Sequence, residues 1–242
     1  MKTKFAIGYN ELSEQCAELM IKQVQKKPNS LMCIATGGSP RLAYKRFVEK
    51  TKENNIDTSN LRIINLDEWH KIDPKNPATC NYFIKEYLLT PLNIGSDRYI
   101  SFDSNCEDTN AECLKISQEL NNEGDIDLAI LGIGMNGHLG LNEPNSVFIN
   151  NAHKVKLSEK TKTHAMLKSN SEHVQMGLTL GIGQLLKSKD IILLVSGENK
   201  EEAYYEFINN EVTPALPASI LKFHQSTICI VEEKISRGRK ND

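Results

Sequence analysis

Short runs of apolar residues recur along this chain and alternate with longer segments in which the apolar residues follow helical spacing. The runs are residues 31–35, 61–66, 98–102, 128–131, 191–195 and 228–231. Most of them are nearly continuous, which indicates strands that are buried on both faces. The segments with helical spacing are residues 11–25, 40–50, 109–122 and 200–209. This repeated βα order predicts an α/β fold in which helices flank a doubly wound, mostly parallel sheet.

Weaker patterns refine this Rossmann-like architecture. Residues 153–157 and 177–180 have the character of extra strands, so we expect a small antiparallel excursion between residues 150 and 179. No linker or low-complexity stretch divides the chain, and we therefore expect residues 1–242 to form a single domain. The basic end of the chain, residues 234–242, is expected to be a flexible, solvated tail.

Composition narrows the classes of function. The chain has 29 basic and 31 acidic residues and a net charge of −2, which lacks the basic excess expected of a nucleic-acid binder. No apolar stretch is long enough for a signal peptide or a membrane span, so we expect no membrane partner and a cytoplasmic location. The six cysteines are scattered, without the spacing of a zinc site, which favours free thiols and no metal.

Polar residues directly follow four of the predicted strands, where ligands bind in open α/β sheets. The first group is Thr36, Gly37, Gly38 and Ser39, at the start of a predicted helix. Glycines, helix N-terminal amides and hydroxyl groups suit a phosphate. No Gly-Lys-Ser/Thr sequence follows, so this segment is not a Walker loop. The alternative is a tight strand-to-helix turn with Ser39 as the helix N-cap.

Two further groups carry charge. Asp67 and Glu68 end a predicted strand, and because neighbours in an extended segment point to opposite sides, we expect only Asp67 to face the crevice; the alternative is that both face water. Lys200 begins a predicted helix, where a cation is unfavourable unless an anion such as a ligand phosphate accompanies it. A solvated surface lysine is the alternative there. His70, close to the two carboxylates, has no further metal ligand at a recognisable spacing.

The remaining group lies in the segment LGIGMNGHLGLNEP, residues 131–144. Gly132, Gly134, Gly137 and Gly140 allow backbone conformations closed to other residues and bring backbone amides close to a ligand. His138 is the side chain of this loop that can exchange a proton near neutrality. The pattern also fits the GxGxxG fingerprint of dinucleotide sites, but that fingerprint requires a helix at its third glycine, and HLGLNEP is a poor helix former. We therefore expect no cofactor.

Together the segments ATGGSP, NLDEW, GIGMNGHLGLNEP and SGENK, in this order, resemble the glucosamine-6-phosphate deaminase/isomerase family and span most of the chain. The details LDEW, NGHLGLNEP, SGENK and PASIL look most like the bacterial galactosamine-6-phosphate branch of that family. The 6-phosphogluconolactonases share the family's fold. The Asn-Glu-Pro after the histidine and the Asp-Glu-aromatic tripeptide are similar to the amino-sugar branch instead.

The resemblance implies a reaction on a 2-amino-2-deoxyhexose 6-phosphate. His138, held by Glu143, would open the sugar ring, and Asp67 would move a proton from C2 to C1 before ammonia is released. The residues that match the family's sugar- and phosphate-binding positions are Thr36, Gly37, Gly38, Ser39, Gly137, Lys200 and Lys168.

One position departs from the glucosamine enzymes. Where they have Asp-Gly-His, this chain has Asn136-Gly137-His138, so a neutral amide replaces a carboxylate in the catalytic set and charge support for the imidazole falls on Glu143. We take Asn136 as a pointer to the galacto epimer, with galactosamine 6-phosphate converted to tagatose 6-phosphate and ammonia. The alternatives are a glucosamine-6-phosphate deaminase giving fructose 6-phosphate, a 6-phosphogluconolactonase, and a non-catalytic sugar-phosphate-binding protein. We expect a monomer or a small homo-oligomer.

Overall fold

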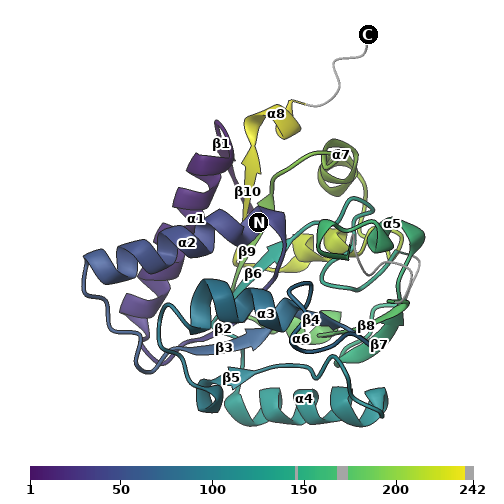
Figure 1. The fold of residues 1–242 in the computed structure, drawn as a ribbon. Helices are drawn as coiled ribbons and strands as arrows, with labels where there is room; N and C mark the ends of the chain where they lie inside the picture. Colours follow the sequence, from purple (N-terminus) through teal and green to yellow (C-terminus); the bar gives the residue numbers. More distant parts are fainter. Residues whose placement is uncertain (145–146, 168–173, 238–242) are drawn as a thin grey trace.

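Two β-sheets form the centre of the protein (Figure 1). The computed structural model describes residues 1–144, 147–167 and 174–237. The larger sheet is parallel throughout, with the strand order β1-β10-β9-β6-β2-β3-β5. Its strands are β1 (Lys2–Ala6), β2 (Leu31–Ile34), β3 (Arg62–Asn65), β5 (Tyr99–Ile100), β6 (Leu128–Gly132), β9 (Asp190–Val195) and β10 (Thr227–Glu232).

The longer helices connect these strands, and shorter ones lie in the loops. The longer helices are α1 (Tyr9–Lys26), α2 (Gly38–Glu53), α4 (Thr109–Glu123) and α7 (Glu201–Asn209). The shorter ones are α3 (Cys80–Ile84), α5 (Glu159–Lys162), α6 (Ile182–Leu186) and α8 (Glu233–Ser236). A π-helical turn at Lys85–Leu89 continues α3, and 3-10 turns lie at Ser96–Arg98, Ala165–Leu167 and Pro217–Phe223.

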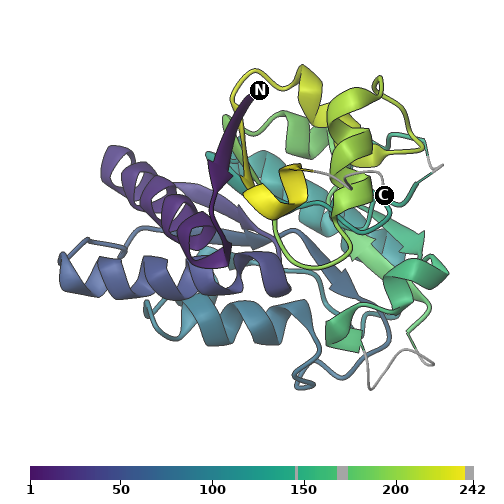
Figure 2. The same cartoon turned by 90° about the horizontal axis from the view of Figure 1, so that it is seen from above.

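Helices cover both faces of the large sheet, which confirms the predicted doubly wound fold. Helices α1 and α2 lie side by side on one face (Figures 1 and 2), where their apolar side chains pack with Met32 and Ile34 of β2. Helices α4, α6 and α7 cover the other face and pack with Leu31 and Cys33 of the same strand. Because both layers are apolar, every residue of β2 is buried, and the strand reads as a continuous apolar run.

A smaller antiparallel sheet, with the order β4-β8-β7, continues from the end of β3. Its strands are β4 (Asp67–Trp69), β7 (His153–Lys156) and β8 (Met176–Thr179). Strands β7 and β8 confirm the predicted antiparallel excursion. Asp67 and Glu68 were expected to end the preceding strand. Instead they begin the separate strand β4, which forms through pairing of Asp67 with Thr179 and of Trp69 with Gly177.

The two ends of the chain were less predictable. Strand β1 lies at the edge of the sheet, and all its residues except Ala6 are exposed, so its sequence lacks a buried pattern. Residues 233–236 form α8 and Ile235 is buried, so the predicted solvated tail is wrong at its beginning. Residues 238–242 lie outside the described part of the chain. The six cysteines are free thiols, as predicted.

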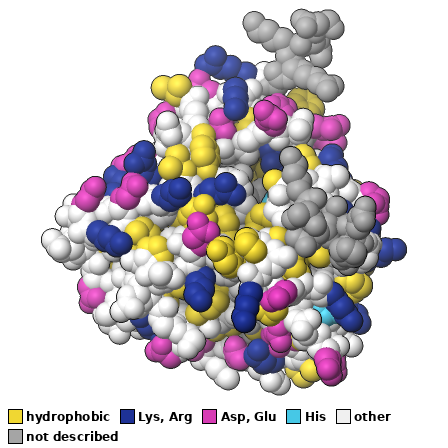
Figure 3. Space-filling view, in the orientation of Figure 1, with side chains coloured by type: hydrophobic (Ala, Val, Ile, Leu, Met, Phe, Trp, Pro, Cys, Tyr) yellow, Lys and Arg dark blue, Asp and Glu magenta, His cyan; other side chains and the backbone are white. Residues whose placement is uncertain are grey.

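The distribution of charged side chains on the surface agrees with the charge balance of the sequence. Basic and acidic side chains are interspersed over the face seen in Figure 3, in keeping with the net charge of −2. Among the described helices, none has the length and apolar character needed to cross a membrane.

The strand order brings the four polar segments to one edge of the large sheet. Strands β9, β6, β2 and β3 are consecutive neighbours and run parallel, so their carboxyl ends share an edge. The chain runs outward from β2 to β3 and β5, then returns to pair β6 with the other side of β2. Ligands bind beyond the strand ends at such a switch point. The segments after these strands contain Thr36, Asp67, His138 and Lys200.

Candidate functional site

The loop after β2 forms the N-terminus of α2. Gly37 is the N-cap residue and has a φ of +101°, a conformation that L side chains rarely adopt. Gly37 has no side chain to cap this helix, and among the described residues no side chain accepts a hydrogen bond from the N–H of Gly38 or Ser39, so these groups are available to an anion. Ser39 lies in the first turn, and its Oγ donates to the carbonyl of Ser196, 3.1 Å away in the loop after β9. The alternative with Ser39 as the N-cap is therefore wrong.

Asp67 and Glu68 have different surroundings at the start of β4. Glu68 is completely buried, and its carboxylate accepts hydrogen bonds of 2.8–2.9 Å from the backbone N–H groups of Trp69, Cys80 and Asn81. It therefore anchors the start of α3. Burial raises the pKa of Asp67 from its ordinary value of 3.8 to about 7. A carboxyl group with this pKa can both take and return a proton near neutral pH.

Cys80, the first residue of α3, links the segments after β2 and β3. Its buried thiol donates to Oδ1 of Asp67 at 3.6 Å and accepts a hydrogen bond from Oγ1 of Thr36 at 3.2 Å. The bond to Asp67 favours the carboxylate and so opposes the effect of burial on the pKa of Asp67. Cys80 was not predicted from the sequence, because a lone cysteine outside any motif gives no signal of this contact.

Two of the four glycines in the loop after β6 have backbone conformations that favour glycine. Gly137 and Gly140 have φ values of +79° and +60°. Gly134 provides space instead, because a Cβ there would lie 2.4 Å from the ring of His138. Gly132 has open space around it. The expectation of special conformations is therefore wrong for Gly132 and Gly134.

The GxGxxG pattern of this loop does not form a dinucleotide fingerprint. Residues 133–144 contain turns and isolated bridges and no helix, whereas the fingerprint needs a helix that begins at its third glycine. The loop instead packs toward β4, because a Cβ on Gly140 would lie 2.8 Å from Oγ1 of Thr179, the residue that pairs with Asp67. The loop that carries His138 and the strand that carries Asp67 therefore lie side by side.

Hydrogen bonds fix the positions of His138 and Glu143. Oε2 of Glu143 lies 3.9 Å from Nδ1 of His138 and accepts a 2.8 Å hydrogen bond from the side-chain amide of Asn136. The side-chain oxygen of Asn136 accepts a bond from the backbone N–H of His138. Ser158 donates its backbone N–H to Glu143, and Oγ1 of Thr161 lies 3.2 Å from Nδ1 of His138. Sequence reasoning missed Ser158 and Thr161, which belong to a hydroxyl-rich helix start without a catalytic motif.

The imidazole of His138 is neutral at neutral pH. Burial lowers its pKa from 6.5 to about 4. The carboxylate of Glu143 opposes this shift, whereas Lys200 and His164 add to it. A neutral imidazole beside a carboxylate can accept a proton and have the resulting charge stabilised.

Lys200 immediately precedes α7 and reaches the loop after β6. Its Nζ donates to the carbonyl of Ile133 at 2.6 Å. Burial lowers the pKa of Lys200 from 10.5 to about 8, and the charge of Lys160 adds to this shift. The alternative of a solvated surface lysine is therefore wrong. Lys168, the second predicted cation, lies outside the described residues.

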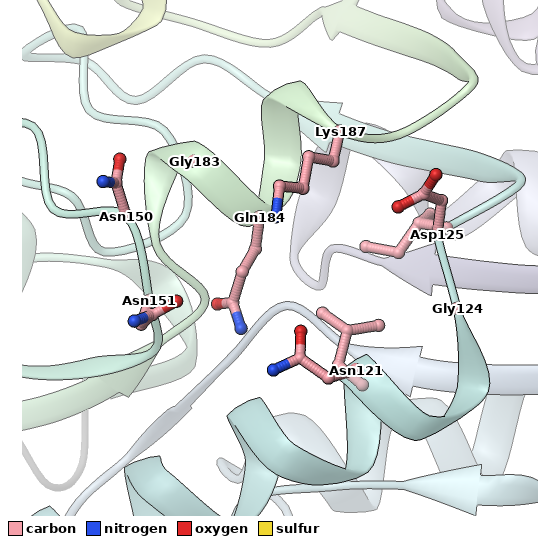
Figure 4. A pocket seen from close by; sticks show the side chains of 10 residues that line it. Asn121, Gly124, Asp125, Asn150, Asn151, Gly183, Gln184 and Lys187 are labelled. Atoms are coloured by element: carbon pink, nitrogen blue, oxygen red, sulfur yellow. The ribbon is translucent and has the colours of Figure 1, made fainter.

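Two other polar features lie apart from this site. A pocket of about 400 Å³ is lined by amide side chains, including Asn121, Asn151 and Gln184 (Figure 4). Its residues 124–126 lead into β6 and Lys187 precedes β9, so it lies near the amino ends of these strands. The ring of His70 contacts the carbonyl of Cys106. Among the described residues there is no group of three or more His, Cys, Asp or Glu side chains suited to a metal ion.

Known sequences similar to this chain are named as deaminases. The chain is 38% identical over 224 residues to the Escherichia coli (strain K12) protein named "Putative deaminase AgaI", which covers 93% of this chain and 89% of that protein. It is 37% identical over 236 residues to the glucosamine-6-phosphate deaminase of Thermoanaerobacter sp. (strain X514), which covers 97% of this chain and 93% of that protein.

Solved structures share the same fold. A monomeric glucosamine-6-phosphate deaminase, described as the missing link of the NagB superfamily, has a TM-score of 0.92 and 29% identity over 99% of this chain and 100% of its own. The 6-phosphogluconolactonase from Leishmania guyanensis has a TM-score of 0.80 at 16% identity over 99% of each chain, which shows a shared fold alone. The family model for glucosamine-6-phosphate isomerases/6-phosphogluconolactonase matches residues 8–230. The chain therefore belongs to the glucosamine-6-phosphate isomerase/6-phosphogluconolactonase family.

Proposed function

We propose that this protein is a hexosamine-6-phosphate deaminase that converts a 2-amino-2-deoxyhexose 6-phosphate into a ketose 6-phosphate and ammonia. The observation that carries the proposal is the pairing of a buried carboxyl group whose pKa is about 7 with a partly buried, neutral imidazole on adjacent segments of one sheet edge. Groups with perturbed pKa values at a strand-end crevice are candidates for acid–base work. The similarity to named deaminases supports the same reaction class.

His138 opens the sugar ring in this proposal. Its neutral imidazole takes the proton of the anomeric hydroxyl group and delivers a proton to the ring oxygen, so the C1–O5 bond breaks and an open-chain aldehyde forms. Glu143, 3.9 Å from Nδ1, stabilises the transient imidazolium. Asn136 donates to Glu143 and so keeps that carboxylate in place.

Asp67 then acts as the base at C2. Its carboxylate removes the C2 proton to give an enolamine and returns the proton to C1, which leaves a ketose imine. Water adds to the imine, the C–N bond breaks, and ammonia and the ketose 6-phosphate are released. Cys80 holds the carboxylate through its thiol, and the raised pKa of Asp67 makes the return of the proton possible near neutral pH.

The first turn of α2 and Lys200 bind the phosphate in this proposal. The backbone N–H groups that begin with Gly38 and the partial positive charge of the helix N-terminus suit a dianion. Thr36 and Gly37 precede this turn, and Ser39 joins it to the loop after β9, from which Lys200 extends. Gly137, with its positive φ, gives the loop after β6 the turn that brings His138 to the sugar.

The finer proposal is that galactosamine 6-phosphate is the preferred substrate and tagatose 6-phosphate the product. Support comes from the segments that resemble the galactosamine branch, among them NGHLGLNEP and PASIL. The side chain of Asn136 already forms hydrogen bonds with Glu143, Ser158 and the backbone of His138. The geometry of Asn136 therefore does not support a direct contact between its side chain and the 4-hydroxyl of the sugar. Glucosamine 6-phosphate is the second candidate, because relatives named as its deaminases are 37% identical over nearly the whole chain.

The test is a side-by-side assay of the purified protein with galactosamine 6-phosphate and glucosamine 6-phosphate, with ammonia as the readout. We expect release of ammonia from both sugars and a higher kcat/KM for the galacto epimer. A higher kcat/KM for the gluco epimer reverses the finer proposal and leaves the reaction class intact. Release of acid from 6-phosphogluconolactone without ammonia from either amino sugar overturns the deaminase proposal.

We also propose that this protein is a monomer in solution, as described for the related deaminase structure. Measurement of the protein's molar mass by light scattering tests this.

A further inference from the structure

His164 lies against the loop that begins α2, although no motif in the sequence marks it. Its ring packs on Trp69 at the end of β4, with ring centroids 5.9 Å apart and a tilt of 46°. A Cβ placed on Gly37 would lie 3.3 Å from Nε2 of His164 and 3.4 Å from the adjacent ring carbon. The Nε2 edge of the imidazole therefore faces the glycine that precedes the first turn of α2.

The hydrogen bond on the other side of the ring assigns the proton. Nδ1 of His164 accepts a hydrogen bond from the backbone N–H of Met166 at 3.3 Å. In a neutral imidazole one nitrogen accepts and the other donates, so Nε2 carries the proton. Among the described residues, none forms a hydrogen bond with this Nε2–H. The donor is thus held in a fixed direction, toward the start of α2.

The groups around His164 favour an anion at this point. The positive charge of Lys200 and burial both lower the pKa of His164, and His164 in turn lowers the pKa of His138. The N-terminus of α2 adds its partial positive charge. Among the described residues, no carboxylate forms a salt bridge with His164 or Lys200. A dianionic group between these donors would be stabilised by each of them.

We propose that His164 is a ligand of the substrate's phosphate group and donates from Nε2 to a phosphate oxygen beside Gly37. This proposal rests on the proposed function, because it assumes that the substrate is a sugar phosphate bound at the start of α2. His164 then shares with Lys200 and the first turn of α2 the recognition that distinguishes a phosphorylated amino sugar from the free sugar. Trp69 contributes by packing against the imidazole.

The test measures inorganic phosphate binding first, because that readout does not depend on catalysis. We compare His164→Ala and His164→Gln with the wild type by calorimetric titration with inorganic phosphate. His153→Ala is the matched control, because His153 lies on β7 with Nδ1 bound to the carbonyl of Asn151. Because His164→Ala removes a hydrogen bond to a charged group, we expect its affinity for inorganic phosphate to fall by about 10-fold or more. The glutamine variant retains a side-chain N–H donor and should recover most of the affinity.

Steady-state kinetics then distinguish binding from chemistry. In His164→Ala we expect KM for the hexosamine 6-phosphate to rise about 10-fold while kcat stays within about 2-fold of the wild type, since binding to the phosphate remains the same throughout the reaction. In the wild type, the Nε2 signal of His164 in a ¹⁵N-labelled sample should shift on addition of inorganic phosphate, which is a check that needs no variant.

The outcomes separate this proposal from the proposed function. An unchanged phosphate affinity in His164→Ala, or a fall in kcat with an unchanged KM, overturns the role of His164 even if ammonia is released normally. A loss of phosphate affinity specific to His164→Ala in a protein that deaminates neither amino sugar supports the phosphate ligand and overturns the deaminase reaction. An Nε2 signal that does not respond to saturating phosphate also overturns the proposal.

Discussion

Asp67 shows how one residue can favour the reaction at the expense of stability. Burial raises its pKa to about 7, which means that the folded protein holds a proton that the unfolded chain releases near pH 4. The contribution of Asp67 to stability is therefore greatest at low pH and is lost as the pH rises through 7. A buried carboxylate at pH 8 costs stability, but it is also the form needed to remove a proton from carbon.

Replacement of Asp67 by Asn should separate these two effects. We expect kcat to fall by about 10²–10⁴-fold, the range for loss of a general base. Because Asn has no proton to lose, the free energy of unfolding should rise by about 2–4 kcal/mol at pH 8 and by less at pH 5. Chemical denaturation at both pH values measures the change. A variant that is inactive and also less stable than the wild type at pH 8 would contradict this account.

Cys80 should tune the pH dependence of the reaction through its hydrogen bond to Asp67. The thiol favours the carboxylate, so Cys80→Ala should raise the pKa of Asp67 further. Loss of one net hydrogen bond corresponds to about 0.5–1 pH unit, so the acidic limb of the kcat/KM profile should move to higher pH by that amount. Cys80→Ser keeps a donor and should leave the limb near the wild-type position. A limb that stays in place in Cys80→Ala would show that the thiol has no part in the titration of Asp67.

At the scale of elements, Gly134 leaves the space that the imidazole of His138 occupies in the loop after β6. A Cβ at Gly134 would lie 2.4 Å from the ring of His138, so Gly134→Ala should force the ring to turn. We expect kcat to fall by about 10-fold or more, because a small misplacement of a catalytic group has a large effect on rate. Gly132→Ala is the control, since it has open space and no positive φ. Equal activity of the two variants would disprove the role of Gly134, and thermal unfolding of both checks that the fold is retained.

The sequence predicts those elements whose burial leaves a regular pattern. Strand β2 is apolar throughout because it has a helix layer on each face, and its bounds were predicted to within one residue. Strand β4 could not be predicted, because Asp67 and Trp69 become a strand only by pairing with Thr179 and Gly177, which are more than a hundred residues away in the chain. The same reason explains why Cys80 and His164 were missed. Their contacts with Asp67 and Gly37 arise only when separate segments fold together.

At the scale of the whole molecule, the meeting of the four polar segments could be predicted because parallel strands end at the same edge. Strands β9, β6, β2 and β3 are neighbours, so segments separated by long stretches of chain meet there. The sequence gives each segment's composition, and the topology gives the meeting point. What the topology leaves undetermined is the direction of each side chain. For example, Ser39 donates to the loop after β9 rather than capping its own helix.

Inorganic phosphate should therefore stabilise the whole fold, because the site proposed for it includes the loops after β2 and β9, which the bond between Ser39 and Ser196 joins. A ligand that binds only the native state at about 100 times its Kd adds about 2.7 kcal/mol, which corresponds to a rise in Tm of about 5–10 °C for a chain of this size. The rise should decline above pH 8, since the cationic form of Lys200 is lost as the pH passes its pKa of about 8.

Two lysine variants locate the phosphate on the molecule. In Lys200→Ala we expect most of the rise in Tm to disappear, because the ammonium group that we propose as a phosphate ligand is gone. Lys187→Ala is the matched control: it removes one cation from the pocket at the amino ends of the strands and should leave the rise intact (Figure 4). The opposite result, with the rise lost in Lys187→Ala and kept in Lys200→Ala, would put the anion at the other edge of the sheet. Asp67 and His138 would then have no phosphate beside them to hold a substrate in place.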